Sequence, residues 1–142
     1  MTKRNGTRRV VVTGLGVVTP IGLNVSDFWS SMKEGKSGVS ELGGFPLDDL
    51  KILIAAQIKN FDPKVQLKNY KRDKIIMHAD RYSWFAAAAA EQAVVQSGIE
   101  FPLENPYRAA CIIGSGAGGL TTFENAYRDL FIHNKSATNP PT

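Results

Sequence analysis

Three short apolar runs without polar alternation form the clearest pattern along the chain. They cover residues 10–12, 52–58 and 109–113. Runs of this kind are typical of strands that are buried on both faces of a parallel sheet. For the second run a helix stays open as the alternative, because periodicity alone does not separate a short buried helix from a buried strand.

Between the first two runs the pattern predicts a helix over residues 26–34. Ser26 is a favourable N-cap residue, Asp27 lies in the first turn, and Gly35 ends the helix. Residues 35–46 are rich in glycine and serine and predict a loop. The apolar face of the helix consists of Phe28, Trp29 and Met32.

The most strongly helical segment covers residues 75–97 and is followed by Gly98, a C-terminal cap. It contains five consecutive alanines, residues 86–90, and alanine has the highest helix propensity. Such small side chains also allow other segments to approach the helix backbone closely. A short basic helix is predicted before it, over residues 64–70, after a turn at residues 61–63 where proline excludes the helical conformation from the preceding residue.

The last predicted helix begins at about Leu120 and ends near His133. Thr121 and Glu124 have the spacing of a capping box at its start. A glycine-rich segment, residues 114–119, leads into this helix from the third apolar run. The segment therefore has the strand-turn-helix context in which glycine motifs bind phosphates in some folds.

Strands alternate with helices along the whole chain, in the order β-α-β-α-α-β-α. This order predicts an α/β fold with a mostly parallel or mixed sheet. Buried strands need cover on both faces and neighbours at both edges, and three strands supply too little of either. We therefore expect the chain to be the front part of a larger α/β protein.

Composition narrows the class of protein. The chain has 142 residues, of which 43% are hydrophobic, enough for one domain with a core. A single cysteine excludes an internal disulfide and favours a reducing compartment, so a cytoplasmic location is expected. Glycines interrupt the first apolar run before it reaches the length of a signal peptide. No window approaches the ~18 apolar residues of a membrane-spanning helix, so no membrane partner is expected.

The formal net charge is +4, and a value this small predicts little about partners. The charges are nevertheless clustered, because five basic residues lie within eleven positions with Asp73 as the only acid. Such a cluster can attract nucleic acid, an anionic membrane or an acidic protein. We expect no nucleic acid as a partner, because the chain lacks zinc-finger spacing and aromatic residues interleaved with the lysines. The cluster consists of Lys64, Lys68, Lys71, Arg72 and Lys74.

Three glycines of the segment 114–119 match the dinucleotide-binding pattern G-x-G-x-x-G: Gly114, Gly116 and Gly119. The acid expected about 20 residues later is missing, since Asp129 comes too early. Leu120 stands where a P-loop would have its lysine. A tight turn with close packing is the favoured interpretation, and a dinucleotide-binding domain stays open as an alternative.

Residues that often carry chemistry are few. Cys111 lies within an apolar run, and we predict a buried core cysteine rather than a nucleophile. His78 and His133 have no metal-ligand partner at helical spacing, so no metal site is expected. Three aromatic residues fit the apolar faces of helices better than a binding site: Trp29, Trp84 and Phe85.

Four segments, in this order, resemble the β-ketoacyl-acyl-carrier-protein synthases, the condensing enzymes of fatty-acid synthesis. Asp80 and Tyr82 match the usual acid and aromatic residue of the family's long alanine-rich helix. The segments are RRVVVTGLGVVTPIG at residues 8–22, FWSSMKEGKSG at 28–38, HADRYSWFAAAAAEQAVVQSG at 78–98 and CIIGSGAGGL at 111–120.

The resemblance implies a thiolase-like fold, in which two similar α/β halves form αβαβα layers, usually in a homodimer. Residues 1–142 would be the N-terminal portion of the first half, with the remainder of that half and the whole second half missing. The implied reaction is the decarboxylative Claisen condensation of an acyl thioester with malonyl-acyl carrier protein. It needs no cofactor.

The family's catalytic cysteine and two histidines belong to segments beyond residue 142. None of them is therefore assigned to this chain, and Cys111 does not match the nucleophile motif. The fragment alone is expected to be inactive. A non-catalytic partner of the same fold, such as a chain-length factor, stays open as an alternative, because the downstream nucleophile decides between them.

The resemblance assigns two roles within the chain. Ala117 stands where elongating members often carry a bulky aliphatic gate beside the acyl pocket, so a more open pocket is expected here. The family docks the acidic carrier protein on a basic surface just before the long helix. Of the candidates only Lys74 aligns cleanly, and Met77 and His78 replace residues that are often basic. The docking candidates are Lys68, Lys71, Arg72 and Lys74.

Overall fold

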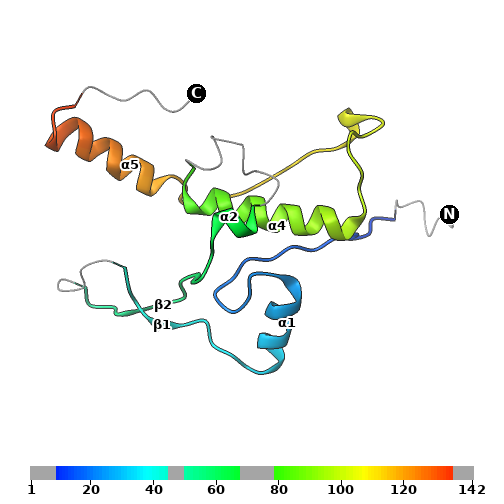
Figure 1. Ribbon diagram of the computed structural model, residues 1–142, viewed down its shortest axis with the longest axis horizontal. Helices are drawn as coiled ribbons and strands as arrows, with labels where there is room; N and C mark the ends of the chain where they lie inside the picture. Colours follow the sequence, from blue (N-terminus) through cyan, green and yellow to red (C-terminus); the bar gives the residue numbers. More distant parts are fainter. Residues whose placement is uncertain (1–8, 45–49, 68–78, 136–142) are drawn as a thin grey trace.

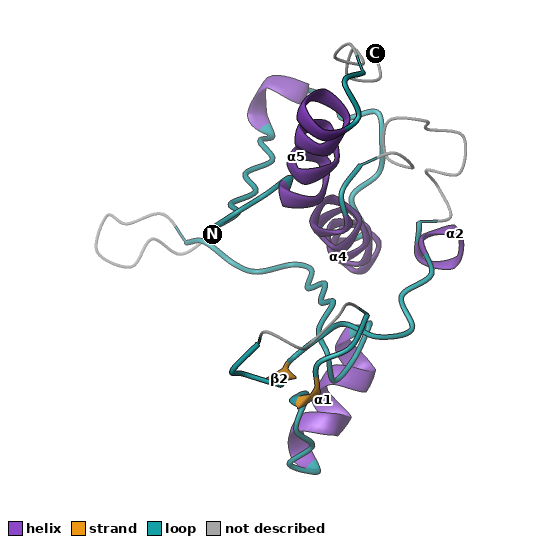
Figure 2. Ribbon diagram, turned by 90° about the vertical axis from the view of Figure 1, so that its left-hand side faces the viewer, coloured by secondary structure: helices purple, strands orange, loops and turns teal. Residues whose placement is uncertain are grey.

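A computed structural model describes residues 9–44, 50–67 and 79–135 of the chain. The longest helix, α4, lies at the centre, and the N-terminal segment runs along it (Figure 1). Viewed along α4, helix α5 lies on one side of it, and α1 with a small β-hairpin lies on the other (Figure 2). The elements therefore contact α4 more than they contact one another.

Helix α1 covers Val25–Lys33. The predicted N-cap at Ser26 is wrong, because Asn24 fills that role: its Oδ1 accepts a hydrogen bond from the backbone N–H of Asp27 at 3.0 Å. Asn and Ser are about equally good caps, so sequence alone did not separate them. The helix ends as predicted before Gly35, whose φ of 67° is easy only for glycine.

The only sheet among the described residues is an antiparallel hairpin of β1 (Ser40–Glu41) and β2 (Ile54–Ala55). β2 confirms a strand within residues 52–58, although a shorter one. β1 lies in a segment that the pattern predicted to be a loop. The side-chain amide of Gln57 continues the ladder, because it donates to the carbonyl of Gly43 and accepts from its N–H, at 3.0 and 3.1 Å.

Helix α2 covers Pro63–Gln66 and is capped by Asp62, whose Oδ1 accepts from the N–H of Lys64 at 2.8 Å. This confirms the turn predicted before it. The rest of the predicted basic helix, from residue 68 onward, lies outside the described residues.

Helix α4 covers Arg81–Ser97 and is closed by Gly98 in the left-handed conformation, as predicted. Its start is later than predicted. Asp80 is the N-cap residue and has extended backbone angles, and residues 75–78 lie outside the described part of the chain.

Helix α5 covers Leu120–Tyr127 and continues as a π-helical turn, η3, over Arg128–Ile132. A short 3₁₀ turn, η2, covers Pro106–Arg108 in the long connection from α4 to α5. The predicted capping box is wrong, because the carboxylate of Glu124 instead contacts the guanidinium of Arg128 at 2.8 Å. One turn apart on a helix, these two side chains are natural partners.

The strands predicted over residues 10–12 and 109–113 are not formed. Their backbones have no neighbouring strand within the described residues, and a strand of a parallel sheet needs such partners. Val10 is 89% exposed and Ile112 is 93% exposed. The prediction of a buried Cys111 is wrong for the same reason, since its thiol is exposed here.

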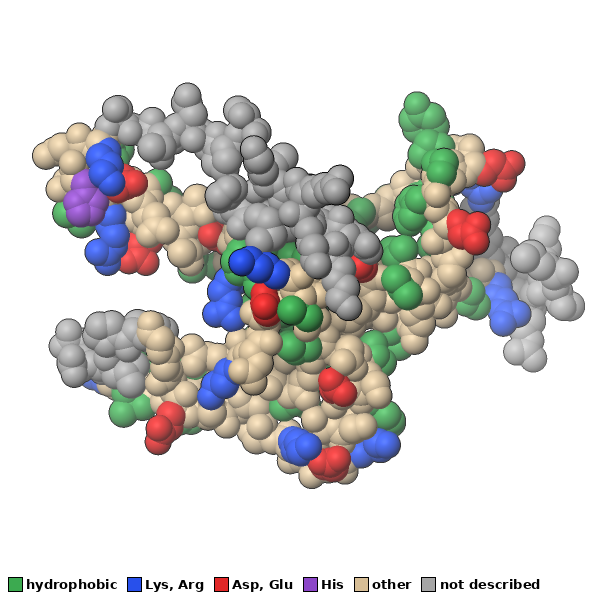
Figure 3. Space-filling model, in the orientation of Figure 1, with side chains coloured by type: hydrophobic (Ala, Val, Ile, Leu, Met, Phe, Trp, Pro, Cys, Tyr) green, Lys and Arg blue, Asp and Glu red, His purple; other side chains and the backbone are tan. Residues whose placement is uncertain are grey.

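Burial is correspondingly sparse. Within the described segments, only Leu67 and Ala88 are buried hydrophobic residues. The predicted core face of α1 is also open, with Trp29 57% and Met32 50% exposed. Apolar side chains lie at the surface along α4 and the segment that follows it (Figure 3). The molecule therefore presents apolar surface that its own described residues do not cover.

Candidate functional site

The N-terminal segment passes directly over the backbone of α4. A Cβ atom on Gly14 would overlap the carbonyl oxygen of Ala93, and one on Gly16 would overlap that of Ala89. Two residues of extended chain span about 6.6 Å, and four residues of helix rise about 6 Å. The two glycines therefore match the two alanines in register, with the segment antiparallel to the helix.

Two glutamines of α4 fix this register with hydrogen bonds. The side-chain oxygen of Gln96 accepts from the N–H of Leu15, and that of Gln92 accepts from the N–H of Val17 at 3.2 Å. The Gln92 amide also donates to the carbonyl of Leu23 at 2.8 Å. Gln92 therefore ties together both ends of the first loop.

The first turn of α4 contacts the glycine-rich segment 114–119. The ring of Tyr82 lies where a Cβ of Gly118 would be, with Cζ 2.9 Å and Oη 3.1 Å from that position. Asp80 reaches the start of α5, where its carboxylate accepts from the hydroxyl of Thr122 at 2.7 Å and from its N–H at 3.4 Å. The N-terminal end of α4 thus holds the turn that leads into α5.

The glycines of the segment 114–119 have different surroundings. Gly119 has a φ of 72° and is the N-cap of α5, which confirms the tight turn. Gly118 confirms the predicted close packing through its contact with Tyr82. Gly114 and Gly116 meet no atom within 4 Å of a built Cβ, so close packing is not observed there.

Ala117, the candidate gate residue, lies in this turn and is exposed in the described chain. Its position follows from its neighbour, because Gly118 packs on Tyr82. The docking candidates Lys68, Lys71, Arg72 and Lys74 lie outside the described residues, so the structure does not bring them together with Ala117.

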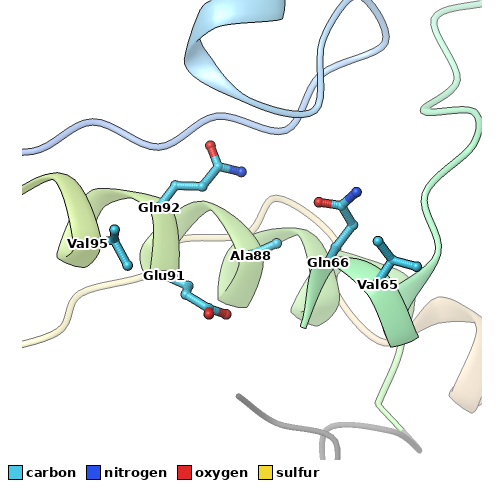
Figure 4. Close-up of a pocket in the computed structure, with 6 residues that line it drawn as sticks. All are labelled: Val65, Gln66, Ala88, Glu91, Gln92 and Val95. Atoms are coloured by element: carbon cyan, nitrogen blue, oxygen red, sulfur yellow. The ribbon is translucent and has the colours of Figure 1, made fainter. Parts of the chain in front are cut away.

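A hollow of about 330 Å³ lies between α2 and α4 (Figure 4). Gln92 points from its rim toward the N-terminal segment, and Glu91 points to the opposite side of the helix. None of the residues that the sequence singled out lines it. The lining residues are Val65, Gln66, Ala88, Glu91, Gln92 and Val95.

A second contact ties α4 to the segment before α2. The guanidinium of Arg81 donates to the carbonyl of Ile58 at 2.9 Å and lies 5.4 Å from the ring centroid of Phe85. The Phe85 ring in turn meets the edge of Phe61 at 4.9 Å. This confirms that Phe85 lies on a packed face of the helix.

Sequence inspection missed the contacts of Asp80 and of both glutamines. A signal for the glutamines was present, since Gln92 and Gln96 are four residues apart and adjoin the small residues Ala89 and Ala93. Nothing in the sequence alone linked Asp80 with Thr122, because 42 residues separate them.

In the part of the chain that the structure describes, no three His, Cys, Asp or Glu side chains form a group that could hold a metal ion. No helix there is long and apolar enough to cross a membrane. The site is therefore a scaffold around α4 and the glycine turn, with backbone amides and small side chains as its main features.

Comparisons with known proteins cover nearly the whole chain. Residues 7–141 match the family model described as "Beta-ketoacyl synthase, N-terminal domain". A Streptomyces cyaneus protein named as a polyketide beta-ketoacyl synthase 1 is 42% identical over 121 residues, which are 85% of this chain and 28% of that protein. The 3-oxoacyl-[acyl-carrier-protein] synthase 2 of Coxiella burnetii is 39% identical over 133 residues, 94% of this chain and 31% of that protein.

Among solved structures, "The ishigamide ketosynthase/chain length factor" matches with a TM-score of 0.54 and 28% identity, over 66% of this chain and 22% of that chain. This similarity and the family match confirm the expected fold class, a part of a thiolase-like α/β fold. The chain spans less than a third of the length of these relatives.

Proposed function

Because the chain belongs to the β-ketoacyl synthase family and matches its N-terminal domain, we propose that it forms part of a 3-oxoacyl-[acyl-carrier-protein] synthase of fatty-acid synthesis. The observation that carries this proposal is the match over residues 7–141. Relatives named 3-oxoacyl-[acyl-carrier-protein] synthase 2 in several bacteria support it. The enzyme is then an acyltransferase of the condensing type.

The proposed reaction has two half-reactions. An acyl group moves from its carrier thioester to a cysteine thiolate, and the carrier thiol leaves. A malonyl group on a second carrier then loses CO₂, and the resulting carbanion attacks the acyl thioester, which expels the cysteine thiolate. Backbone N–H groups and histidines stabilise the oxyanions that develop. These catalytic groups come from outside residues 1–142, which contribute the scaffold and one wall of the acyl pocket.

An assay of the gene product that contains this segment tests the proposal. The protein is mixed with malonyl-carrier protein and an acyl-carrier protein, and both CO₂ release and the 3-oxoacyl thioester are measured. Equal amounts of the two products are expected. If neither forms until an active ketosynthase is added, the protein is a non-catalytic partner, the role that the name of the solved chain-length-factor relative suggests.

A dinucleotide-binding role is less favoured. The fingerprint of Gly114, Gly116 and Gly119 lies inside the family match, and the strand that should precede it is not formed. A thermal-shift experiment with NAD and NADP decides it: stabilisation by either would support this role.

We assign the gate of the acyl pocket to Ala117. Its small side chain leaves room that a bulky aliphatic residue would fill, so Ala117→Ile should shorten the acyl chain that the enzyme accepts. The measurement is kcat/KM for hexanoyl- and myristoyl-carrier protein, and a drop for the longer chain alone is expected. An unchanged preference would refute the assignment.

Acyl carrier protein is the proposed macromolecular partner, with Lys68, Lys71, Arg72 and Lys74 as its docking residues. Charge attraction of this kind acts mainly on the association rate and weakens with salt. Lys74→Glu should therefore slow association at low salt, with little effect at high salt. We further propose a homodimer in the cytoplasm, as is usual for the family and consistent with the single cysteine.

A further inference from the structure

We propose that Asp80 and Thr122 are positioning residues that hold the turn at residues 117–119 and thereby set acyl-chain selectivity. The inference rests on the proposed function, because selectivity has meaning only in a condensing enzyme. It rests on three features of the structure: an uncapped helix start, a carboxylate shared by two helix ends, and a glycine that a tyrosine ring requires.

Helix α5 begins without a cap of its own. Its N-cap residue is Gly119, which has no side chain to accept hydrogen bonds from the first turn. The first N–H groups of a helix have no partner within the helix. Asp80 supplies an acceptor from another element, with its Oδ2 3.4 Å from the N–H of Thr122.

The hydroxyl of Thr122 strengthens this contact. It donates to Oδ1 of Asp80 at 2.7 Å, so both carboxylate oxygens bond to one residue. A hydrogen bond to a charged acceptor is stronger than one between neutral groups. A valine at this position would keep the shape and the backbone bond but lose the hydroxyl bond.

The same carboxylate lies at the start of α4. Asp80 is the N-cap residue of that helix, yet its side chain forms no cap bond there. Negative charge is favourable at the N-terminal end of a helix. The Asp80 carboxylate therefore suits the ends of α4 and α5 together, and it couples their positions.

Tyr82 holds the other side of the turn. Its ring lies 2.9 Å from the Cβ that any other residue at Gly118 would need, so the backbone passes directly over the ring. Ala117 immediately precedes this contact. Upstream, Gly114 and Gly116 have open space around a built Cβ. Within the described residues, the turn is thus held from its α4 side.

The experiment compares two adjacent threonines in the gene product that contains this segment. Thr122→Val removes the hydroxyl bond, and Thr121→Val makes the same change at the neighbouring exposed residue. Thr122→Ser keeps the hydroxyl. Two quantities are measured: amide hydrogen exchange across residues 117–122, and the ratio of kcat/KM for myristoyl- and hexanoyl-carrier protein.

For Thr122→Val we expect faster exchange and a ratio shifted by about threefold to tenfold, the range of one hydrogen bond to a charged group. Thr122→Ser should restore both, and Thr121→Val should change neither. Unchanged exchange in Thr122→Val would overturn the proposal. So would an equal loss of kcat/KM for both substrates, because that result indicates a merely structural role.

The outcomes separate this inference from the proposed function. If the unmodified protein does not condense, the proposed function fails and the selectivity role falls with it. If it condenses and Ala117→Ile changes the chain-length ratio while Thr122→Val does not, the gate stands and the positioning role is refuted.

Discussion

Helix α4 is held at its two ends in different ways. Along its second half, the N-terminal segment lies on the helix backbone, with Gly14 and Gly16 over Ala93 and Ala89. At its first turn, exposed side chains make the contacts, chiefly the hydrogen bonds of Asp80 to Thr122. The first contact depends on the absence of side chains, and the second depends on their presence.

This difference predicts different tolerance to mutation. A backbone-to-backbone contact leaves no room for even one methyl group, because protein interiors are close-packed. An exposed hydrogen bond exchanges with water at modest net cost. Substitutions along the second half of α4 should therefore affect folding, and substitutions at the first turn should affect the position of the glycine turn.

Gly16→Ala should have the largest effect on stability. Its Cβ would overlap the carbonyl oxygen of Ala89, a backbone atom that cannot move without the helix. Overpacking of this kind costs about 1–3 kcal/mol or more. Urea denaturation of the gene product measures the change in unfolding free energy.

Gly43→Ala is the matched control, since a Cβ on Gly43 meets no atom within 4 Å and its φ lies outside the left-handed region. It should leave stability nearly unchanged. If both variants unfolded at the same urea concentration, the close contact between Gly16 and α4 would be refuted.

Gln92→Leu should have the next largest effect. The substitution keeps the volume but removes the acceptor for Val17 and the donor for Leu23. Each part-buried backbone group left without its partner costs about 1–3 kcal/mol. Thermal unfolding, monitored by circular dichroism, measures the loss as a lower Tm.

Gln66→Leu is the control, because Gln66 lines the same hollow from α2. Its Tm should stay close to that of the unmodified protein. Gln92→Glu sharpens the comparison further, since a carboxylate still accepts from Val17 but cannot donate to Leu23. A Gln92→Leu variant as stable as Gln66→Leu would contradict the role of Gln92 in holding the loop.

The same distinction explains which parts of the fold were predictable from sequence. Helices α1 and α4 were found because local signals define them: a polar cap, a run of alanines and a closing glycine such as Gly98. The strands at residues 10–12 and 109–113 were predicted from apolar composition alone. A strand also needs neighbours, and no described segment pairs with either run.

The candidate site divides along the same line. The turn at Gly119 was predictable, because a glycine-rich segment before a helix is a local signal. The partner of Thr122 was not, because Asp80 lies 42 residues earlier and on another helix. The register of Gly14 and Gly16 was within reach, since the spacing of glycines in a strand-like segment matches that of alanines on a helix.

The smallest effect on stability is expected at the first turn of α4. Thr122→Val should lower the unfolding free energy by less than about 1 kcal/mol, because the bond to Asp80 is exposed and water replaces it. Urea denaturation beside Gly16→Ala places both contacts on one scale. A loss as large as that of Gly16→Ala would show that the first turn supports folding as much as the second half does. A small loss together with a changed chain-length ratio would show that the two ends of α4 serve folding and selectivity separately.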